Sequence, residues 1–214
     1  MQAQILGISG SPIKDSNTDR LVREILKSSG LTSEFVKLSD IQVGPCRACL
    51  GCRSDNICKL EDDFPSLAEK VRQADALVVG GHATYGTMNG YTKLFLERLF
   101  SLRHREGLNW GKLAVAVATG NGRGRPGLEA ASEQIAHSLA WEGMEVLGAL
   151  QITGNPKCLS CGYGPTCPMS ALPHVFGPDN TEVTPDKFCK VEDQTETWER
   201  AQALGRKIGK RLAG

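Results

Sequence analysis

The sequence predicts an α/β domain built on a parallel sheet that helices cover on both faces. Five short apolar runs alternate with five stretches in which apolar residues recur at helical spacing. The runs at 76–80 and 113–118 are apolar on both faces, which is typical of strands buried between two layers of helices. The length of 214 residues suits a single domain, 1–214, with room for one insertion.

The first half of the chain supplies two strands and two helices. An apolar run at 5–8 ends in a Ser-Gly-Ser-Pro turn, and helical spacing follows at 21–26. We expect a second strand at 33–38, a cysteine-rich loop at 45–59, and then a helix that ends near Ala74. Asp62 and Asp63 favour a helix start, because acidic side chains suit the positive end of the helix dipole.

The second half continues the alternation and then breaks it. Strands and helices are expected in turn at 76–80, 94–105, 113–118, 128–141, 146–152 and 201–212. The exception is 154–190, which holds six of the ten prolines and four of the eight cysteines. This segment, called the insertion below, is predicted to be too small and irregular to bury a core of its own. Its cysteines are therefore expected to hold it.

Charge and hydropathy exclude several classes of partner. The 25 Lys and Arg residues nearly balance the 24 Asp and Glu residues, whereas nucleic-acid-binding proteins usually carry a basic excess. No apolar run approaches the roughly 20 residues that span a bilayer. The first nine residues lack the basic and apolar regions of a signal peptide. We therefore expect a cytoplasmic protein without nucleic-acid or membrane partners.

Three polar loops follow predicted strands, and ligands bind at the carboxyl ends of the strands in open parallel sheets. The loop at 9–18 is rich in hydroxyl and amide groups and precedes a helix, which suits a phosphate. In the loop at 82–90, Tyr85 can stack on a flat ring. The loop at 119–124 supplies glycines that allow close backbone approach. Taken alone, each loop is equally compatible with ordinary turn chemistry.

Four motifs make the chain resemble the NADPH-dependent FMN reductase branch of the flavodoxin-like superfamily over 4–152. They are Gly7-Ile8-Ser9-Gly10-Ser11-Pro12, Ser16-Asn17-Thr18, Tyr85-Gly86-Thr87-Met88-Asn89-Gly90 and Lys93-Leu94-Phe95-Leu96-Glu97-Arg98. The resemblance implies a flavodoxin-like, doubly wound sheet of five parallel strands. It also implies that Ser9, Ser11, Ser16, Asn17 and Thr18 hold the FMN phosphate. The isoalloxazine ring would meet Thr84, Tyr85, Gly86, Met88, Asn89, Thr119, Gly120, Asn121 and Gly122.

A compact cysteine quartet lies in the loop at 45–59, with the spacing Cys46-x2-Cys49-x2-Cys52-x5-Cys58. Four thiolates that converge on one centre favour a [4Fe–4S] cluster. Structural zinc more often uses two separated Cys-x2-Cys pairs, and disulfides would be out of place in a reducing cytosol; both stay open as alternatives. With this quartet the chain resembles the iron–sulfur flavoproteins. That resemblance implies FMN and one cluster per chain, in a homodimer or homotetramer.

A second set of cysteines, Cys158, Cys161, Cys167 and Cys189, lies in the insertion. Its spacing is compatible with a second [4Fe–4S] cluster, with zinc or with free thiols. The shortage of apolar residues around it favours a metal.

Three functional hypotheses follow. The first is an FMN- and [4Fe–4S]-dependent oxidoreductase that passes electrons between a one-electron donor such as ferredoxin and a small two-electron acceptor. The second is an NAD(P)H-dependent FMN or quinone reductase with structural zinc. The third is a non-catalytic electron carrier or redox sensor. In the first, the cofactors carry the chemistry and no catalytic side chain is expected.

Overall fold

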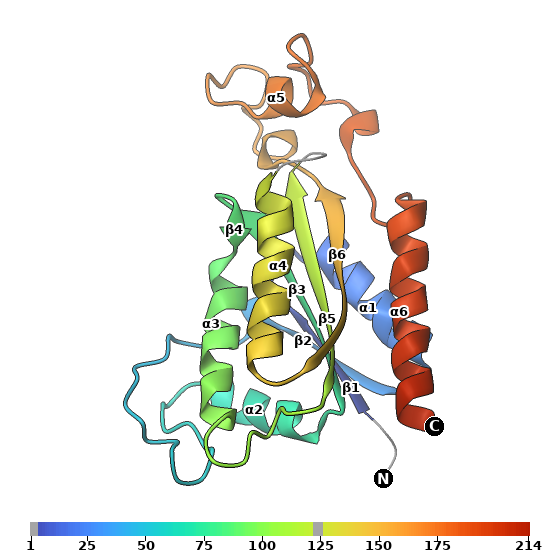
Figure 1. Cartoon of the computed structure of the whole chain (residues 1–214). Helices are drawn as coiled ribbons and strands as arrows, with labels where there is room; N and C mark the ends of the chain where they lie inside the picture. Colours follow the sequence, from blue (N-terminus) through green and yellow to red (C-terminus); the bar gives the residue numbers. More distant parts are fainter. Residues whose placement is uncertain (1–3, 122–125) are drawn as a thin grey trace.

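A computed structural model describes residues 4–121 and 126–214 (Figure 1). Its main sheet is parallel, with the strand order β2-β1-β3-β5-β6. The strands are β1 (Gln4–Ser9), β2 (Thr32–Lys37), β3 (Ala76–Thr84), β5 (Leu113–Asn121) and β6 (Glu145–Gly154). A two-residue strand, β4 (Thr87–Met88), pairs antiparallel with the end of β3. The strand order reverses between β1 and β3, which is where this architecture binds ligands.

Helices cover both faces of the sheet, as predicted. On one face lie α1 (Asn17–Ser29) and α6 (Thr195–Ala213), and on the other lie α2 (Phe64–Gln73), α3 (Gly90–Arg98) and α4 (Pro126–Trp141). Gly205 and Gly209 let α6 cross α1 closely, because a Cβ on Gly209 would lie 2.1 Å from the carbonyl oxygen of Ser29. The C-terminal helix is thus fixed directly against the helix that follows the first polar loop.

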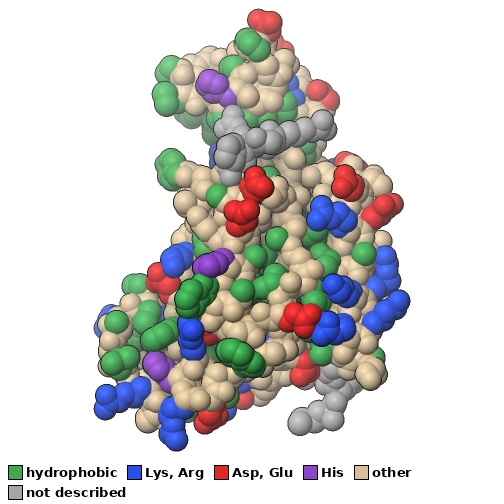
Figure 2. Space-filling view, in the orientation of Figure 1, with side chains coloured by type: hydrophobic (Ala, Val, Ile, Leu, Met, Phe, Trp, Pro, Cys, Tyr) green, Lys and Arg blue, Asp and Glu red, His purple; other side chains and the backbone are tan. Residues whose placement is uncertain are grey.

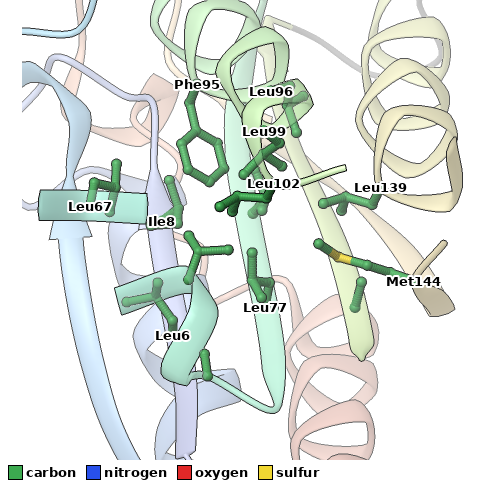
Figure 3. Packing of buried hydrophobic residues seen from close by; sticks show 14 of the residues in the cluster. Leu6, Ile8, Leu67, Leu77, Phe95, Leu96, Leu99, Leu102, Leu139 and Met144 are labelled. Atoms are coloured by element: carbon green, nitrogen blue, oxygen red, sulfur yellow. The ribbon is translucent and has the colours of Figure 1, made fainter. Parts of the chain in front are cut away.

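Two apolar layers form the core on either side of the sheet. Figure 3 shows the layer beneath α2, α3 and α4, where Leu67, Phe95 and Leu139 meet Ile8 and Leu77 of the sheet. These side chains are at most 2% exposed, and each buried side chain of this size contributes about 1.5–3 kcal/mol. This packed core therefore holds the strands in place, and with them the polar loops that follow their carboxyl ends.

Some predicted boundaries were wrong. Strands β3 and β5 continue to Thr84 and Asn121, beyond the predicted ends, because pairing in the sheet extends past the apolar core. The helix predicted to reach residue 105 ends at Arg98 and continues as the 3₁₀ turn Leu99–Leu102. The insertion contains a short unpredicted helix, α5 (Leu172–Phe176), and it buries Leu159 and Leu172. These two leucines are its only large buried apolar side chains among the described residues.

Two irregular segments leave the body of the domain at opposite ends. The cysteine loop at 45–59 lies between the 3₁₀ turn Leu38–Asp40 and α2, at the lower left of Figure 1. The insertion rises above the carboxyl edge of the sheet, at the top of the same view. Among the described residues, no helix is both long and apolar enough to cross a membrane.

Candidate functional site

A cavity of about 1090 Å³ opens at the carboxyl ends of β1, β3 and β5. All three predicted polar loops contribute to its lining, together with the insertion. The predicted site residues that line it are Ser11, Ser16, Asn17, Thr18, Thr84, Tyr85, Gly86, Thr119, Gly120 and Asn121. The cavity is as large as the sites that hold cofactors and drug-sized ligands.

One end of the cavity is built around the start of α1. The hydroxyl of Ser16 accepts the N–H of Asp19, and the Asp19 carboxylate accepts the N–H of Ser16, each at 3.1 Å. This capping box leaves the other first-turn amides without an intrahelical acceptor, and they can bind an anion. Thr18 and Thr119 share a 2.6 Å hydrogen bond that joins the first and third loops.

Positive charge gathers at the same end. Arg20 lines the cavity, and its guanidinium donates to the Asn17 side chain at 2.6 Å and to Glu192 at 2.6 Å. Lys157 and Lys190 of the insertion also line the cavity. Of these three cations, sequence reasoning assigned none to the site. Arg20 and the α1 dipole suit a phosphate dianion, whereas the charge of Lys157 acts on His82 at the end of β3.

The opposite wall of the cavity can receive a flat ring. Tyr85 lies at the turn between β3 and β4 with a left-handed φ of 51°, and its side chain is fully exposed. The next residue, Gly86, packs so closely on Gly127 that a Cβ on Gly127 would lie 2.5 Å from the Gly86 Cα. This contact holds the turn against the start of α4, so the position of Tyr85 is fixed by backbone packing.

His82 faces the cavity in a partly buried position. Within the described part of the chain, its buried Nδ1 has no hydrogen-bond partner. Burial, and secondarily the charge of Lys157, lowers the pKa of His82 below 6.5, so the imidazole is neutral at pH 7. The unpartnered Nδ1 lies on the buried side of the ring, so it is the neutral imidazole as a whole that borders the cavity.

Three predicted ligand contacts lie behind the cavity wall instead of lining it. Ser9 is buried and donates to Asp19 at 2.5 Å. Asn89 is buried and donates to the carbonyl of Gly10 at 2.7 Å, so it ties the second loop to the first. Met88 packs against the apolar core. Gly122, also predicted to contact the ring, lies outside the described residues.

The four thiols of the first quartet line one small hollow of about 20 Å³. Cys46 and Cys49 are exposed, Cys58 is half-buried and Cys52 is buried. Ala48, Leu50 and Asn56 have left-handed φ angles of 50–56°, although none of them is glycine. Such angles cost about 1–3 kcal/mol each and persist where the surroundings impose them. The loop is therefore wound tightly around its cysteines.

The pKa of the Cys52 thiol is raised by its surroundings. Burial raises the pKa of Cys52, and negative charge on Cys58, Cys49 and Cys46 raises it further. A thiol in such surroundings would lose its proton on binding a metal, because the cation neutralises the charge of the thiolate. Four cysteines around one hollow are a donor set of the kind that a thiolate-bound metal or cluster needs.

Arg98 fixes this loop to the domain, a role that sequence reasoning missed. Its side chain is only 1% exposed, and it donates to the Cys58 sulfur at 3.2 Å, to the Gly44 carbonyl at 3.0 Å and to both carboxylate oxygens of Asp62. Burial opposes the charge of Asp62, but hydrogen bonds from Arg98 and from the Gly44 amide outweigh burial and hold its pKa below the usual range. Both ends of the loop are thereby anchored to α3.

The second quartet is divided between two places in the insertion. Cys158, Cys161 and Cys167 lie in its first half, whereas Cys189 lines the large cavity. All eight cysteines are free thiols. Within residues 4–121 and 126–214, no group of three or more His, Cys, Asp or Glu side chains is arranged as a ready metal site.

Comparison with known proteins identifies the family. The family described as NADPH-dependent FMN reductase matches residues 3–155. The chain belongs to this family. Its members are flavin-dependent oxidoreductases, and the same holds for this protein.

Proteins named iron–sulfur flavoproteins are similar to this FMN reductase family member over about three quarters of its length. An iron–sulfur flavoprotein of Methanocaldococcus jannaschii is 32% identical over 165 residues, which cover 76% of this chain and 84% of the relative. An iron–sulfur flavoprotein of Methanosarcina thermophila is 31% identical over 72% of this chain and 83% of the relative. An archaeal flavodoxin structure, 14% identical, matches 99% of both chains with a TM-score of 0.55. The flavodoxin-like fold predicted from the sequence is thus confirmed.

Proposed function

We propose that this chain is an FMN- and [4Fe–4S]-dependent oxidoreductase, which passes electrons between a one-electron donor such as ferredoxin and a small two-electron acceptor. One observation carries the proposal: a cofactor-sized cavity with an anion-binding end occurs in the same chain as a hollow lined by four thiols. The relatives named iron–sulfur flavoproteins support the pairing of the two cofactors.

In the proposed complex the FMN phosphate lies at the start of α1, near Ser11, Ser16 and Thr18. The first-turn amides, the α1 dipole and Arg20 bind its charge. The ring lies between Tyr85 and the third loop, beside the neutral imidazole of His82. When bound, FMN exchanges one or two electrons, whereas an iron–sulfur cluster exchanges one at a time.

Cys46, Cys49, Cys52 and Cys58 are the proposed cluster ligands. Arg98 would position Cys58 and favour the reduced cluster, because it donates a hydrogen bond to the sulfur and carries a buried positive charge. The exposed Cys46 and Cys49 would leave one side of the cluster open to a redox partner. Nothing in this arrangement requires a side chain to act as acid or base.

The positions of the two sites support the proposed homodimer or homotetramer. The cavity lies at the end of the sheet where α3 begins, and Arg98, beside the thiols, is the last residue of α3. The helix alone spans about 13 Å, from its nine residues and a rise of about 1.5 Å each. Exposed apolar side chains, Leu50, Ile57 and Phe100, surround the thiols, and Figure 2 shows hydrophobic groups in this region at the lower left. A second copy could cover them and bring its own cavity to this cluster.

Single-turnover kinetics under anaerobic conditions test the route of the electrons. Flavin reduction by reduced ferredoxin is compared in the unmodified protein and in Cys52→Ser, with NADPH as the alternative donor. We expect Cys52→Ser to keep FMN but to lose at least about 100-fold in the rate with ferredoxin, since the one-electron route is removed. Unchanged ferredoxin rates, with fast NADPH reduction in both proteins, would favour the plain NAD(P)H-dependent reductase instead.

A further inference from the structure

We propose that Cys158, Cys161, Cys167 and Cys189 form a second metal centre, which clamps the insertion over the cofactor cavity. The ligand is a thiolate-seeking metal, either a zinc ion or an iron–sulfur cluster. The proposal concerns residues that the first centre does not use, so it holds whether or not the proposed electron route is correct.

Backbone turns fold the segment that carries the first three cysteines. The N–H of Cys161 donates to the Lys157 carbonyl at 3.0 Å, and the N–H of Cys167 donates to the Tyr163 carbonyl at 2.9 Å. Between these turns, Gly164 packs on the Cys158 carbonyl so closely that a Cβ there would lie 2.5 Å from the oxygen. The segment from 158 to 167 is therefore folded back on itself.

The sulfur of Cys158 already accepts a hydrogen bond. The Ala171 amide donates to it at 3.2 Å, and the Cys161 sulfur lies 3.8 Å from the Cys158 carbonyl oxygen. Amide hydrogen bonds to sulfur stabilise a thiolate and orient it toward a metal. The Cys158 sulfur thus already lies where a thiolate is stabilised, whereas the Cys161 sulfur, now directed at the Cys158 carbonyl, would turn toward the metal when it binds.

The fourth cysteine is tied to the start of the insertion. The N–H of Cys189 donates to the Asn155 side chain at 2.7 Å, and the Asn155 amide donates back to the Cys189 carbonyl at 3.0 Å. Asn155 lies only three residues before Cys158. The backbone of Cys189, although 31 residues from Cys158 in sequence, is therefore tied near the start of the segment that carries the other three cysteines, and metal binding would bring its sulfur to theirs.

The same backbone is linked to the phosphate end of the cavity. Asn17, the first residue of α1, donates to the Cys189 carbonyl at 3.0 Å and accepts the Val191 N–H at 3.2 Å. Phe188 and Lys190, the two neighbours of Cys189 in sequence, line the cavity. A metal at the quartet would hold this wall in place and would thereby slow the release of FMN.

The packing of the insertion explains why it needs such a clamp. Leu159 and Leu172 are its large buried apolar side chains, and neither belongs to the main core layers. Tyr163 and Met169 are 73% and 85% exposed. Small segments with so little buried apolar area usually depend on metals or disulfides, and these cysteines are free thiols.

Metal analysis of the anaerobically purified full-length protein tests the proposal, with Cys161→Ser as the variant and Cys49→Ser as the matched control. Both positions are exposed cysteines in Cys-x2-Cys turns. We expect either about eight irons, or about four irons and one zinc, in the unmodified chain. Cys161→Ser should lose the second contribution only, whereas Cys49→Ser should lose the first. Metal content that Cys161→Ser leaves unchanged would overturn the proposal.

Thiol mapping on the unmodified protein keeps the test valid if Cys161→Ser does not fold. An exposed free thiol reacts at once with iodoacetamide, but a metal-bound one does not. Cys161 should therefore be alkylated only after a chelator has removed the metal, as judged by mass spectrometry. Immediate alkylation of Cys161 in protein that retains its FMN and its first centre would contradict the second centre. If the unmodified protein contained the second centre but neither FMN nor the first centre, the proposed function would be wrong and the second centre would stand.

Discussion

The two cysteine segments are held to the same domain in opposite ways. The loop at 45–59 is fixed by a buried ion pair, in which Arg98 of α3 holds Asp62 and Gly44 at the end and the start of the loop. The insertion is joined to the body by the side chain of Asn17, is closed on itself by that of Asn155, and buries two leucines. The difference indicates that the first loop is shaped before its cofactor binds. The second would acquire its shape from its metal.

The largest effect is expected from breaking the ion pair of the first loop. Arg98→Met leaves the Asp62 carboxylate partly buried without its partner, and removal of one member of such a pair costs about 3–5 kcal/mol. Urea denaturation of the metal-free protein measures this loss. Arg211→Met is the control, because its pair with Glu145 is half exposed and worth less than about 1 kcal/mol. If the two variants lost the same free energy of unfolding, Arg98 would not anchor the first loop and the proposed difference between the two segments would be wrong.

Removal of metal should loosen the insertion more than the loop at 45–59. Chelation is expected to speed proteolysis within the insertion by about tenfold, equivalent to about 1.4 kcal/mol of local opening free energy. Cleavage within 45–59 should change less, because Arg98 still holds its ends. Mass spectrometry of the early fragments identifies the sites of cleavage. Preferential cleavage within 45–59 would show that the first loop is the one shaped by its metal.

The link between the insertion and the cavity can be cut at one residue. Asn17→Ala removes the hydrogen bonds to Cys189, Val191 and Arg20, and we expect FMN affinity to fall about tenfold; a faster exchange of the Val191 amide in the variant would show that the insertion has loosened. Asn180→Ala is the matched control within the insertion, because its side chain only donates to the Phe176 carbonyl. Fluorescence titration of the metal-loaded apoflavoprotein measures both. The coupling is absent if the two variants bind FMN equally well.

The smallest effect concerns the pH dependence of the cavity. The pKa of His82 is below 6.5 in the folded chain, so the unfolded chain binds its proton at a higher pH. Stability should therefore be fully retained above pH 6.5 and should fall as pH drops from 6.5 toward the folded pKa, by less than about 1.4 kcal/mol per pH unit. His82→Gln should flatten this slope in denaturation series at several pH values. His174→Gln, an exposed control, should not.

The sheet, the helices and the three loops could be predicted because each leaves a local pattern. Apolar runs and helical spacing mark the strands and helices, and Ser16 and Asp19 mark the start of α1 within four residues. The anchors could not be predicted in this way. Arg98 meets Cys58 across 40 residues, and Asn17 meets Cys189 across 172. No local spacing encodes such contacts, because only the folded sheet brings their partners together.

The most direct measurement is the iron, acid-labile sulfide, zinc and FMN content of the anaerobically purified chain, with visible spectra before and after dithionite. The account predicts about one FMN and at least about four irons with matching sulfide per chain, and bleaching of the cluster absorption on reduction. FMN with zinc and no sulfide would contradict the iron–sulfur assignment of Cys46, Cys49, Cys52 and Cys58. Clusters without FMN would contradict the assignment of the cavity.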